Sequence, residues 1–413
     1  MKAAGVIVEF NPLHNGHIEH LRETKRLTQR EHIIAVMSGN FVQRGEPAIC
    51  DKWRRTRMAL LAGVDIVIEL PVSYVVSGAD YFARASVKLL ASTGVVDRLC
   101  FGSEIGELAP IKEAGRVLAF EPEEYKTALQ NGLKQGMSFA AARGAALEAV
   151  LGDMPQGLLT KPNNGLGMEY CKALWQMGWP MDVFTSFRGA GGPSASAIRR
   201  GIWGSLEASS EAGGINDCKP AANPSVMDTR SIGKAVTESM PSYALEILLE
   251  AIQANEISRL DDYSEIFRYL LLTQEVDMGE GLENRFRHYA RFHTGLSGLL
   301  DAVKTKRYTY TRLQRAALGV ILGMRPSDLA AYEKAGGPAY IRVLGFRPRA
   351  AGLLGEMTRR AALPVITHGK AMDELEGPAA SMLTKELEVG DIYRLSGLRG
   401  YRHERGMPMV IVE

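Results

Sequence analysis

Short runs of β-branched and other apolar residues alternate with helical patterns over the first half of the chain. The predicted strands are Ala3 to Val8, Ile33 to Met37, Asp65 to Glu69, Asp97 to Phe101 and Met181 to Phe187. Helices are expected to begin between them, near Gly16, Asp51, Ala79 and Glu107, and Asp51 is a typical N-cap residue. This alternation predicts an α/β fold with a parallel sheet, whose ligand-binding loops follow the carboxyl ends of the strands.

The pattern changes after residue 205. Residues 206–239 are small, polar and interrupted by Gly and Pro, which predicts a linker or insertion. Beyond residue 240, apolar residues recur at three- and four-residue spacing in PSYALEILLEAI, EIFRYLLLTQ, LENRFRHYARF and TRLQRAALGVIL. We therefore expect three parts: an α/β domain over 1–205, a linker over 206–239 and a mainly α-helical domain over 240–413. The runs YIRVLGF and MPMVIVE predict a small appendage of strands.

Composition indicates a folded protein rather than a disordered or membrane-embedded one. The 413 residues are 46% hydrophobic and 23% charged, and no apolar run approaches the length of a membrane span. The apolar start of the chain ends at Glu9, too early for a signal peptide, so a cytoplasmic location is expected. The scattered cysteines show no spacing typical of zinc or disulfides, and no metal site is predicted. Because the net charge is only +2, nucleic-acid binding would depend on local basic patches.

The most informative motif is His14-Asn15-Gly16-His17, between the first predicted strand and the helix after it. Unpaired N–H groups and the positive end of the helix dipole favour phosphate at such a position. Both imidazoles can donate hydrogen bonds to a phosphate ester, and Gly16 leaves space beside them. The alternative is that these histidines only cap the helix.

Polar residues near other strand ends are further candidates. Gly102 would let a ligand lie against the backbone, and Asn163 with Asn164 offers donors and acceptors to a base edge, although both patterns are also typical of turns. Arg188 follows the last strand and could reach phosphate, or lie on the surface. The loop SGNFVQRGEP carries Asn40, Gln43 and Arg44, which suit either substrate contact or an ordered loop.

A basic and aromatic segment, KTKRYTYTRLQR, lies in the helical half. Its cations can contact an RNA backbone and its tyrosines can stack on unpaired bases. The candidate residues are Lys304, Lys306, Arg307, Tyr308, Tyr310, Arg312 and Arg315. The alternative is an amphipathic helix with a basic outer face. DKWRRTR, Asp51 to Arg57, is a second basic patch.

These motifs together resemble a known family. HNGH resembles the HxGH signature of the nucleotidyltransferase superfamily, and SASAIRRG at Ser194 to Gly201 resembles its second signature. The strings VMSGNFVQRGEPAICDKWRRTR, FGSE, KPNNGLGMEYCKAL and KTKRYTYTRLQRA are similar to bacterial tRNA(Met) cytidine acetate ligases. The resemblance covers nearly all of residues 1–203 and segments of the remainder.

The resemblance implies a Rossmann-like domain that activates acetate with ATP to acetyl-adenylate. The acetyl group would pass to the 4-amino group of the wobble cytidine of elongator tRNA(Met). His14, His17 and Arg199 would be catalytic, with Ser196 and Arg199 on the β- and γ-phosphates. The implied ATP site comprises Ile7, Val8, Glu9, Phe10, Asn11, Pro12, His14, Gly16, His17, His20, Gly102, Asn163, Asn164, Arg188, Ser196 and Arg199. Mg²⁺ is expected with ATP, and acetyl-CoA is not expected to be required.

Two other functions remain open at this point. An adenylyltransferase for a small phosphorylated metabolite would share both signatures but would not need a basic and aromatic helical half. A tRNA-binding protein with a degenerate nucleotide pocket would not need His14, His17 and Arg199. No oligomeric state is predicted.

Overall fold

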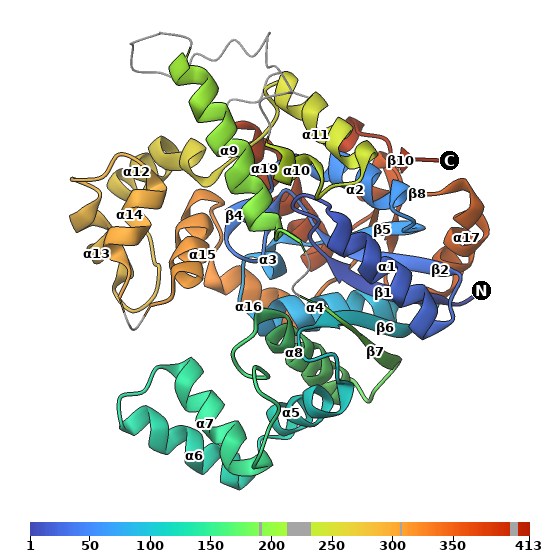
Figure 1. Ribbon diagram of the computed structural model, residues 1–413, viewed down its shortest axis with the longest axis horizontal. Helices are drawn as coiled ribbons and strands as arrows, with labels where there is room; N and C mark the ends of the chain where they lie inside the picture. The colour runs from blue at the N-terminus through green and yellow to red at the C-terminus, as the bar shows by residue number, and fades with distance from the viewer. Residues whose placement is uncertain (190–191, 213–232, 306–307, 397–403) are drawn as a thin grey trace.

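A twisted, mostly parallel sheet forms the centre of the molecule, which is described by a computed structural model for residues 1–189, 192–212, 233–305, 308–396 and 404–413 (Figure 1). The strand order is β10-β8-β5-β2-β1-β6-β7. The parallel strands are β1 (Ala3–Val8), β2 (His32–Ser38), β5 (Ile66–Leu70), β6 (Val96–Ser103) and β7 (Asp182–Phe187). All five predicted strands are confirmed, with ends that shift by at most two residues.

Strands from the carboxy-terminal half extend this sheet. β8 (Ile341–Phe346) lies antiparallel to β5, while β9 (Val365–Ile366) and β10 (Val410–Ile411) run parallel to β8. The runs that were expected to form a small appendage of strands therefore belong to the main sheet. Without β8, the buried strand β5 would end the sheet with unpaired backbone groups, and β8 satisfies them.

The helices of the amino-terminal half flank the sheet. The predicted helix starts are confirmed by α1 (Asn15–Thr28), α2 (Lys52–Leu61), α4 (Ala79–Ser92) and α5 (Leu108–Phe120). Asp51 caps α2 by accepting hydrogen bonds from the backbone N–H groups of Trp53 and Arg54. The remaining helices here are α3 (Val72–Val75), α6 (Glu123–Lys134), α7 (Phe139–Leu151), α8 (Pro162–Gln176) and α9 (Ala195–Ala212). Helices α6 and α7 form a hairpin that projects from the body (Figure 1).

The carboxy-terminal half is mainly helical apart from its three strands. Its helices are α10 (Lys234–Thr237), α11 (Ser242–Gln253), α12 (Ser264–Thr273), α13 (Leu282–Tyr289), α14 (Leu296–Val303), α15 (Tyr310–Ile321), α16 (Pro326–Lys334), α17 (Ala351–Arg360), α18 (Gly369–Met372) and α19 (Gly377–Arg394). The four predicted amphipathic segments correspond to α11, α12, α13 and α15. In the expected linker, residues 206–212 continue α9 and α10 is helical, while 213–232 lie outside the described residues. Among the helices that the structure describes, none is long and apolar enough to cross a membrane.

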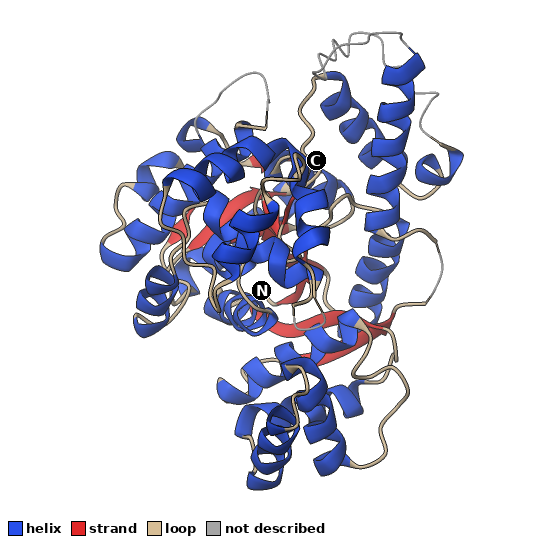
Figure 2. Ribbon diagram, turned by 90° about the vertical axis from the view of Figure 1, so that its left-hand side faces the viewer, coloured by secondary structure: helices blue, strands red, loops and turns tan. Residues whose placement is uncertain are grey.

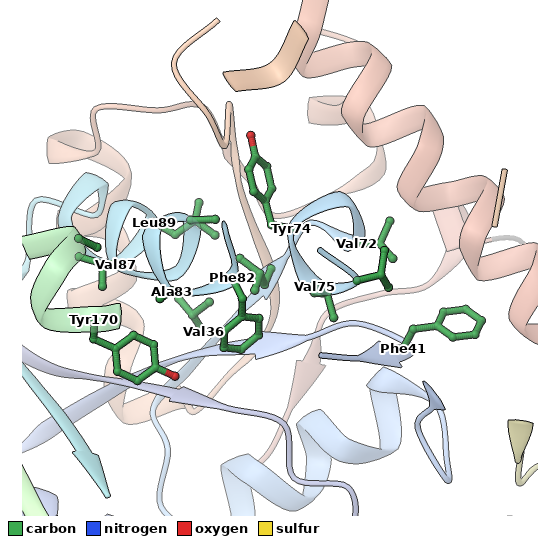
Figure 3. Close-up of a cluster of buried hydrophobic side chains, with 14 of the residues drawn as sticks. Val36, Phe41, Val72, Tyr74, Val75, Phe82, Ala83, Val87, Leu89 and Tyr170 are labelled. Atoms are coloured by element: carbon green, nitrogen blue, oxygen red, sulfur yellow. The ribbon is translucent and has the colours of Figure 1, made fainter. Parts of the chain in front are cut away.

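Helices cover both faces of the sheet (Figure 2), and an apolar cluster fills the space on each face. Alternate strand positions separate them, because successive side chains of a strand point to opposite faces. On β2, Ile34 and Val36 belong to the cluster under α4 and α8, which Figure 3 shows together with Phe82 and Tyr170. Ile33 and Ala35 belong to the other cluster, with side chains of α2 and α11. Because side chains cover both faces of the sheet, a ligand can approach the parallel strands at the edge where their loops meet.

A buried ionic cluster joins the two halves of the chain. Lys52 Nζ lies 2.6 Å from Glu69 Oε1 and 2.7 Å from Glu404 Oε2, and Arg342 Nη1 lies 2.9 and 3.0 Å from Glu69 Oε2 and Glu404 Oε2. These side chains are at most 2% exposed. A third carboxyl group, Glu386, lies with its Oε1 3.9 Å from Lys52 Nζ, and burial and the nearby Glu69 raise its pKa.

Removing one cation should therefore destabilise the fold. Lys52→Met removes one of the two cations that pair with the buried carboxyl groups of Glu69 and Glu404 and leaves Arg342 to both of them, and we expect a loss of about 3–5 kcal/mol in the free energy of unfolding. Lys385→Met is the matched control, because Lys385 pairs with Glu388 at the surface, and its cost should stay below about 1 kcal/mol. Chemical denaturation followed by circular dichroism measures both variants. Equal losses would contradict the role given to the cluster.

Candidate active site

A cleft of about 730 Å³ opens at the carboxyl edge of β1, β6 and β7. It brings together most of the residues expected at the ATP site, which come from segments as far apart in the chain as Ile7 and Arg199. The expected residues that line it are Ile7, Val8, Glu9, Phe10, Asn11, Gly16, His17, His20, Gly102, Asn163, Arg188, Ser196 and Arg199. Three expected residues, Pro12, His14 and Asn164, lie behind this surface.

The histidines of HNGH form a reciprocal cap on α1. His14 Nδ1 accepts a hydrogen bond from the backbone N–H of Gly16 at 3.1 Å, and His17 Nδ1 accepts one from the backbone N–H of His14 at 3.2 Å. The two rings stack with centroids 3.8 Å apart. A Cβ atom at position 16 would lie 2.9 Å from the His14 ring, so Gly16 makes room for that ring rather than for a ligand alone.

This cap fixes the tautomer of both rings. A neutral imidazole that accepts at Nδ1 carries its proton on Nε2, so each histidine presents one Nε2–H donor. His14 Nε2 is buried and has no hydrogen-bond partner among the described residues. Since an unsatisfied buried donor is costly, this atom is suited to an acceptor supplied by a ligand. Capping and ligand binding are therefore compatible, because Nδ1 of each ring caps the helix and Nε2–H is left to donate to a ligand.

All three histidines of this region are held neutral. Burial and the neighbouring Arg188 lower the pKa of His14 and of His20 to about 4. Burial, followed by His14, Arg188 and His20, places the pKa of His17 well below its usual range. His20 Nδ1 also lies 2.7 Å from Ser186 Oγ. Near neutral pH the imidazoles donate hydrogen bonds without bringing positive charge, which must come from arginine.

Arg199 is already partnered by protein groups. Its Nη1 donates to the backbone carbonyl of Asn11 at 2.6 Å, and its Nη2 pairs with Glu46 and lies 3.4 Å from Ser196 Oγ. Arg199 and Ser196 thus lie side by side on the cleft wall. Glu46 holds the guanidinium where an anionic ligand would compete for it.

The paired asparagines have different positions. Asn164 is fully buried, where its Oδ1 accepts the backbone N–H of Glu104 at 2.8 Å and its amide donates to Gly157, so its side chain joins two loops. Asn163 lines the cleft, donates to Glu104 and accepts a hydrogen bond from Arg188 at 3.2 Å. Asn163 therefore orients Arg188.

The cleft has open space at Gly102, near Ser186, Arg188 and His20. A Cβ atom there would make only ordinary contacts, at 3.8 Å or more. Protein packing therefore does not require glycine at this position, and the space beside its backbone is available to a ligand.

The loop SGNFVQRGEP folds as a small hairpin of β3 (Phe41–Val42) and β4 (Glu46–Pro47). Gln43 and Arg44, at its tip, line the cleft. Asn40 is buried away from the cleft, where its Oδ1 accepts the backbone N–H of Lys52 at 2.9 Å. Two of these three polar residues are therefore available to a ligand.

Side chains of the basic and aromatic segment around α15 make more contacts within the protein than the sequence predicted. Tyr308 is only 9% exposed and donates its hydroxyl to Glu280 at 3.0 Å, while the Arg312 guanidinium lies over the Tyr308 ring and pairs with Glu280 at 2.5 Å. The segment had no acidic neighbour in sequence, but the fold supplies one. Tyr310 is half-buried and Lys304 is exposed. Lys306 and Arg307 lie outside the described residues.

Several cleft residues were not predicted individually. Glu46, Tyr170 and Ser186 all line the cleft. Glu46 had a signal, since it lies in the same polar loop as Gln43 and Arg44. Tyr170 and Ser186 had none, because a tyrosine in a helix and a serine in a strand are common in any core.

The fold and this cleft define a HIGH-type nucleotidyltransferase, and the family model described as HIGH Nucleotidyl Transferase matches residues 1–405. The tRNA(Met) cytidine acetate ligase of Caldanaerobacter subterraneus subsp. tengcongensis is 39% identical over 96% of each chain, and that of Acetivibrio thermocellus is 36% identical over 89% of this chain and 88% of the relative. The crystal structure of Thermotoga maritima TmcAL bound with alpha-thio ATP superposes with a TM-score of 0.86 at 30% identity, covering 100% of this chain and 99% of that chain. The chain belongs to the tRNA(Met) cytidine acetate ligase family.

The neutral histidines give a direct prediction. In the folded protein, His14 and His20 should protonate with midpoints near pH 4, whereas the unfolded chain takes up these protons near pH 6.5. Their contribution to stability is then complete above pH 6.5 and is lost as the pH falls toward 4. NMR titration of the imidazole Cε1–H signals, assigned with His14→Gln and His20→Gln, measures the midpoints. Midpoints above pH 6 would contradict this account.

Proposed function

We propose that this protein activates acetate with MgATP and transfers the acetyl group to the 4-amino group of the wobble cytidine of elongator tRNA(Met). The observation that carries the proposal is the histidine pair at the start of α1. His17 lines a cleft that also holds Arg188 and Arg199, and His14 stacks on His17 with its Nε2 unpartnered among the described residues. The family and the alpha-thio ATP complex of Thermotoga maritima TmcAL support ATP as the nucleotide.

In the first half-reaction, an acetate oxygen attacks the α-phosphate of ATP and pyrophosphate leaves. His14 and His17 donate to the oxygens on which charge develops, and Arg199 with Ser196 holds the β- and γ-phosphates. The phosphates displace Glu46 from the Arg199 guanidinium. Preorganised donors of this kind lower the barrier because they need no reorganisation during the reaction.

In the second half-reaction, the cytidine amine attacks the acetyl carbon and AMP leaves. The tRNA approaches over the hairpin β3–β4, because α15 packs against it. A Cβ atom at Gly45 would lie 2.5 Å from the backbone nitrogen of Arg315, and Arg315 Nη1 contacts the Gln43 carbonyl at 3.5 Å. The basic segment around α15 and the cleft therefore share one rim. Lys304, Lys306, Arg307, Tyr308, Tyr310, Arg312 and Arg315 remain the proposed tRNA surface, with Lys304 and Arg312 the more exposed of the described ones.

The test is incubation of the purified protein with MgATP, labelled acetate and unmodified elongator tRNA(Met), followed by nucleoside analysis. We expect labelled 4-acetylcytidine that depends on ATP. Labelled acetyl-adenylate without labelled RNA would support the first half-reaction and show that elongator tRNA(Met) is not the acceptor. If neither product forms, the proposal is overturned, and a metabolite adenylyltransferase is favoured instead.

A matched pair of variants isolates the chemistry of His14. His368 caps α18 in the same way, because its Nδ1 accepts the backbone N–H of Ala371 at 3.2 Å, but it lies outside the cleft. His14→Ala and His368→Ala should each cost about 1 kcal/mol of stability through the lost cap. Only His14→Ala should slow acetate-dependent pyrophosphate release, by about 10²-fold or more. Comparable activity in both variants would restrict His14 to capping.

Charge removal tests the proposed tRNA surface. The double variant Lys304→Gln, Lys306→Gln should weaken tRNA binding and reduce the salt slope of log Kd by about one for each lost phosphate contact. Lys126→Gln, on the exposed face of α6, is the control. Filter binding across a range of KCl concentrations measures both. An unchanged slope in the double variant would place the RNA elsewhere.

A further inference from the structure

Glu9 occupies a fixed position at the end of β1. The buried Arg55 guanidinium donates to the Glu9 backbone carbonyl at 2.7 Å. Glu9 Oε1 accepts hydrogen bonds from the backbone N–H of Gln43 at 2.6 Å and from Ser38 Oγ at 3.3 Å. The carboxyl group is thus held by one oxygen, and its second oxygen, Oε2, has no partner among the described residues.

The charge state of Glu9 is unusual for the cleft. The other carboxylates that line it each form an ion pair: Glu19 with Arg22, Glu23 with Arg26, Glu46 with Arg199 and Glu169 with Arg143. In the part of the chain that the structure describes, Glu9 alone among these carboxylates has no ion-paired cation. Such a group retains its capacity to accept a proton.

Every charged neighbour of Glu9 can be named. Burial raises the pKa of this carboxyl group and Glu46 raises it further, while the hydrogen bond from Gln43 and the charges of Arg44 and Arg55 lower it, and the net effect is a raised pKa. Tyr170, on α8, also faces it and stays un-ionised because burial raises its own pKa. A carboxylate with a raised pKa is a stronger base than an ordinary one.

The position of Glu9 also fits the second half-reaction. Gln43 donates its N–H to Glu9 and accepts, through its carbonyl, the contact from Arg315 of α15. Gln43 therefore contacts both Glu9 and Arg315, a residue of the proposed tRNA surface. Glu9 is thus linked through Gln43 to α15, which belongs to the proposed tRNA surface.

The histidines cannot serve as the base. The Nδ1 lone pairs of His14 and His17 accept the capping hydrogen bonds, and their Nε2 atoms carry protons. His20 Nδ1 is occupied by Ser186. Proton transfer to any of these rings would also produce a buried cation near Arg188, which their lowered pKa values disfavour.

We propose that Glu9 is the general base of acetyl transfer, an inference that rests on the proposed function. The cytidine N4 atom attacks the acetyl carbon, a C–N bond forms, and the C–O bond to the AMP phosphate breaks. The N4 proton moves to Glu9 Oε2, and AMP leaves with the electron pair of the broken bond. The carboxylic acid then releases its proton to water, so that atoms and charge balance.

The test measures the two half-reactions separately in the Glu9→Gln variant. The glutamine keeps an oxygen that accepts from Gln43 and Ser38, so the cleft should keep its shape. Glu9 is also an expected residue of the ATP site, so acetate-dependent exchange of pyrophosphate into ATP is measured in parallel and should fall by much less than transfer does. Single-turnover transfer from the bound adenylate to tRNA should be slower by about 10²–10³-fold. Transfer by the parent protein should decrease as the medium is acidified through the raised pKa of Glu9, and this decrease should be absent from Glu9→Gln.

Each other outcome overturns the assignment. Equal losses in exchange and transfer would make Glu9 a structural or nucleotide-binding residue, and unchanged transfer would show that it accepts no proton. Glu31→Gln, at the opposite edge of the sheet before β2, is the control and should leave both steps unchanged. If the parent protein itself forms no acetyl-adenylate, the proposed function fails, which is distinct from a failure of this inference.

Discussion

The site depends on how α1 satisfies its first backbone N–H groups. A helix that begins at the edge of a ligand cleft needs acceptors for these donors, and His14 and His17 supply them through Nδ1. Because both rings are then neutral and carry their protons on Nε2, the same hydrogen bonds that start the helix aim two donors away from it. Gly16 is required for the ring stacking, and burial with Arg188 keeps the rings uncharged. Among the described side chains that line the cleft, the arginines therefore supply the positive charge.

The hairpin β3–β4 connects the chemistry of the cleft to the carboxy-terminal half. It presents Glu46 to Arg199 and the N–H of Gln43 to Glu9, while α15 packs against its tip. The base of this arrangement is rigid, because Asn40 is tied to α2 and Lys52 takes part in the buried ionic cluster with Glu69 and Glu404. A substrate that contacts α15 would thus be positioned relative to the cleft, because the well-packed hairpin β3–β4 lies between α15 and the cleft.

Periodicity and motif context predicted the parallel strands, the first helices and the position of HNGH, because these depend on local patterns of apolar residues and caps. Long-range pairing was not predictable in this way: YIRVLGF has an ordinary strand pattern, and only the open edge of β5 explains why it joins the main sheet. Likewise, Asn163 and Asn164 are adjacent and chemically identical, yet one lines the cleft and the other is buried. The acidic partner of Tyr308 and Arg312 also comes from a distant segment, at Glu280.

The central claim is that acetate attacks the α-phosphate of ATP in this cleft. The most direct measurement uses acetate labelled with ¹⁸O in a complete reaction with MgATP and elongator tRNA(Met), with mass analysis of every phosphorus product. Attack at the α-phosphate followed by acetyl transfer leaves one acetate oxygen in AMP, and this is the result that the account predicts. Label in inorganic phosphate, or AMP without label, would contradict it.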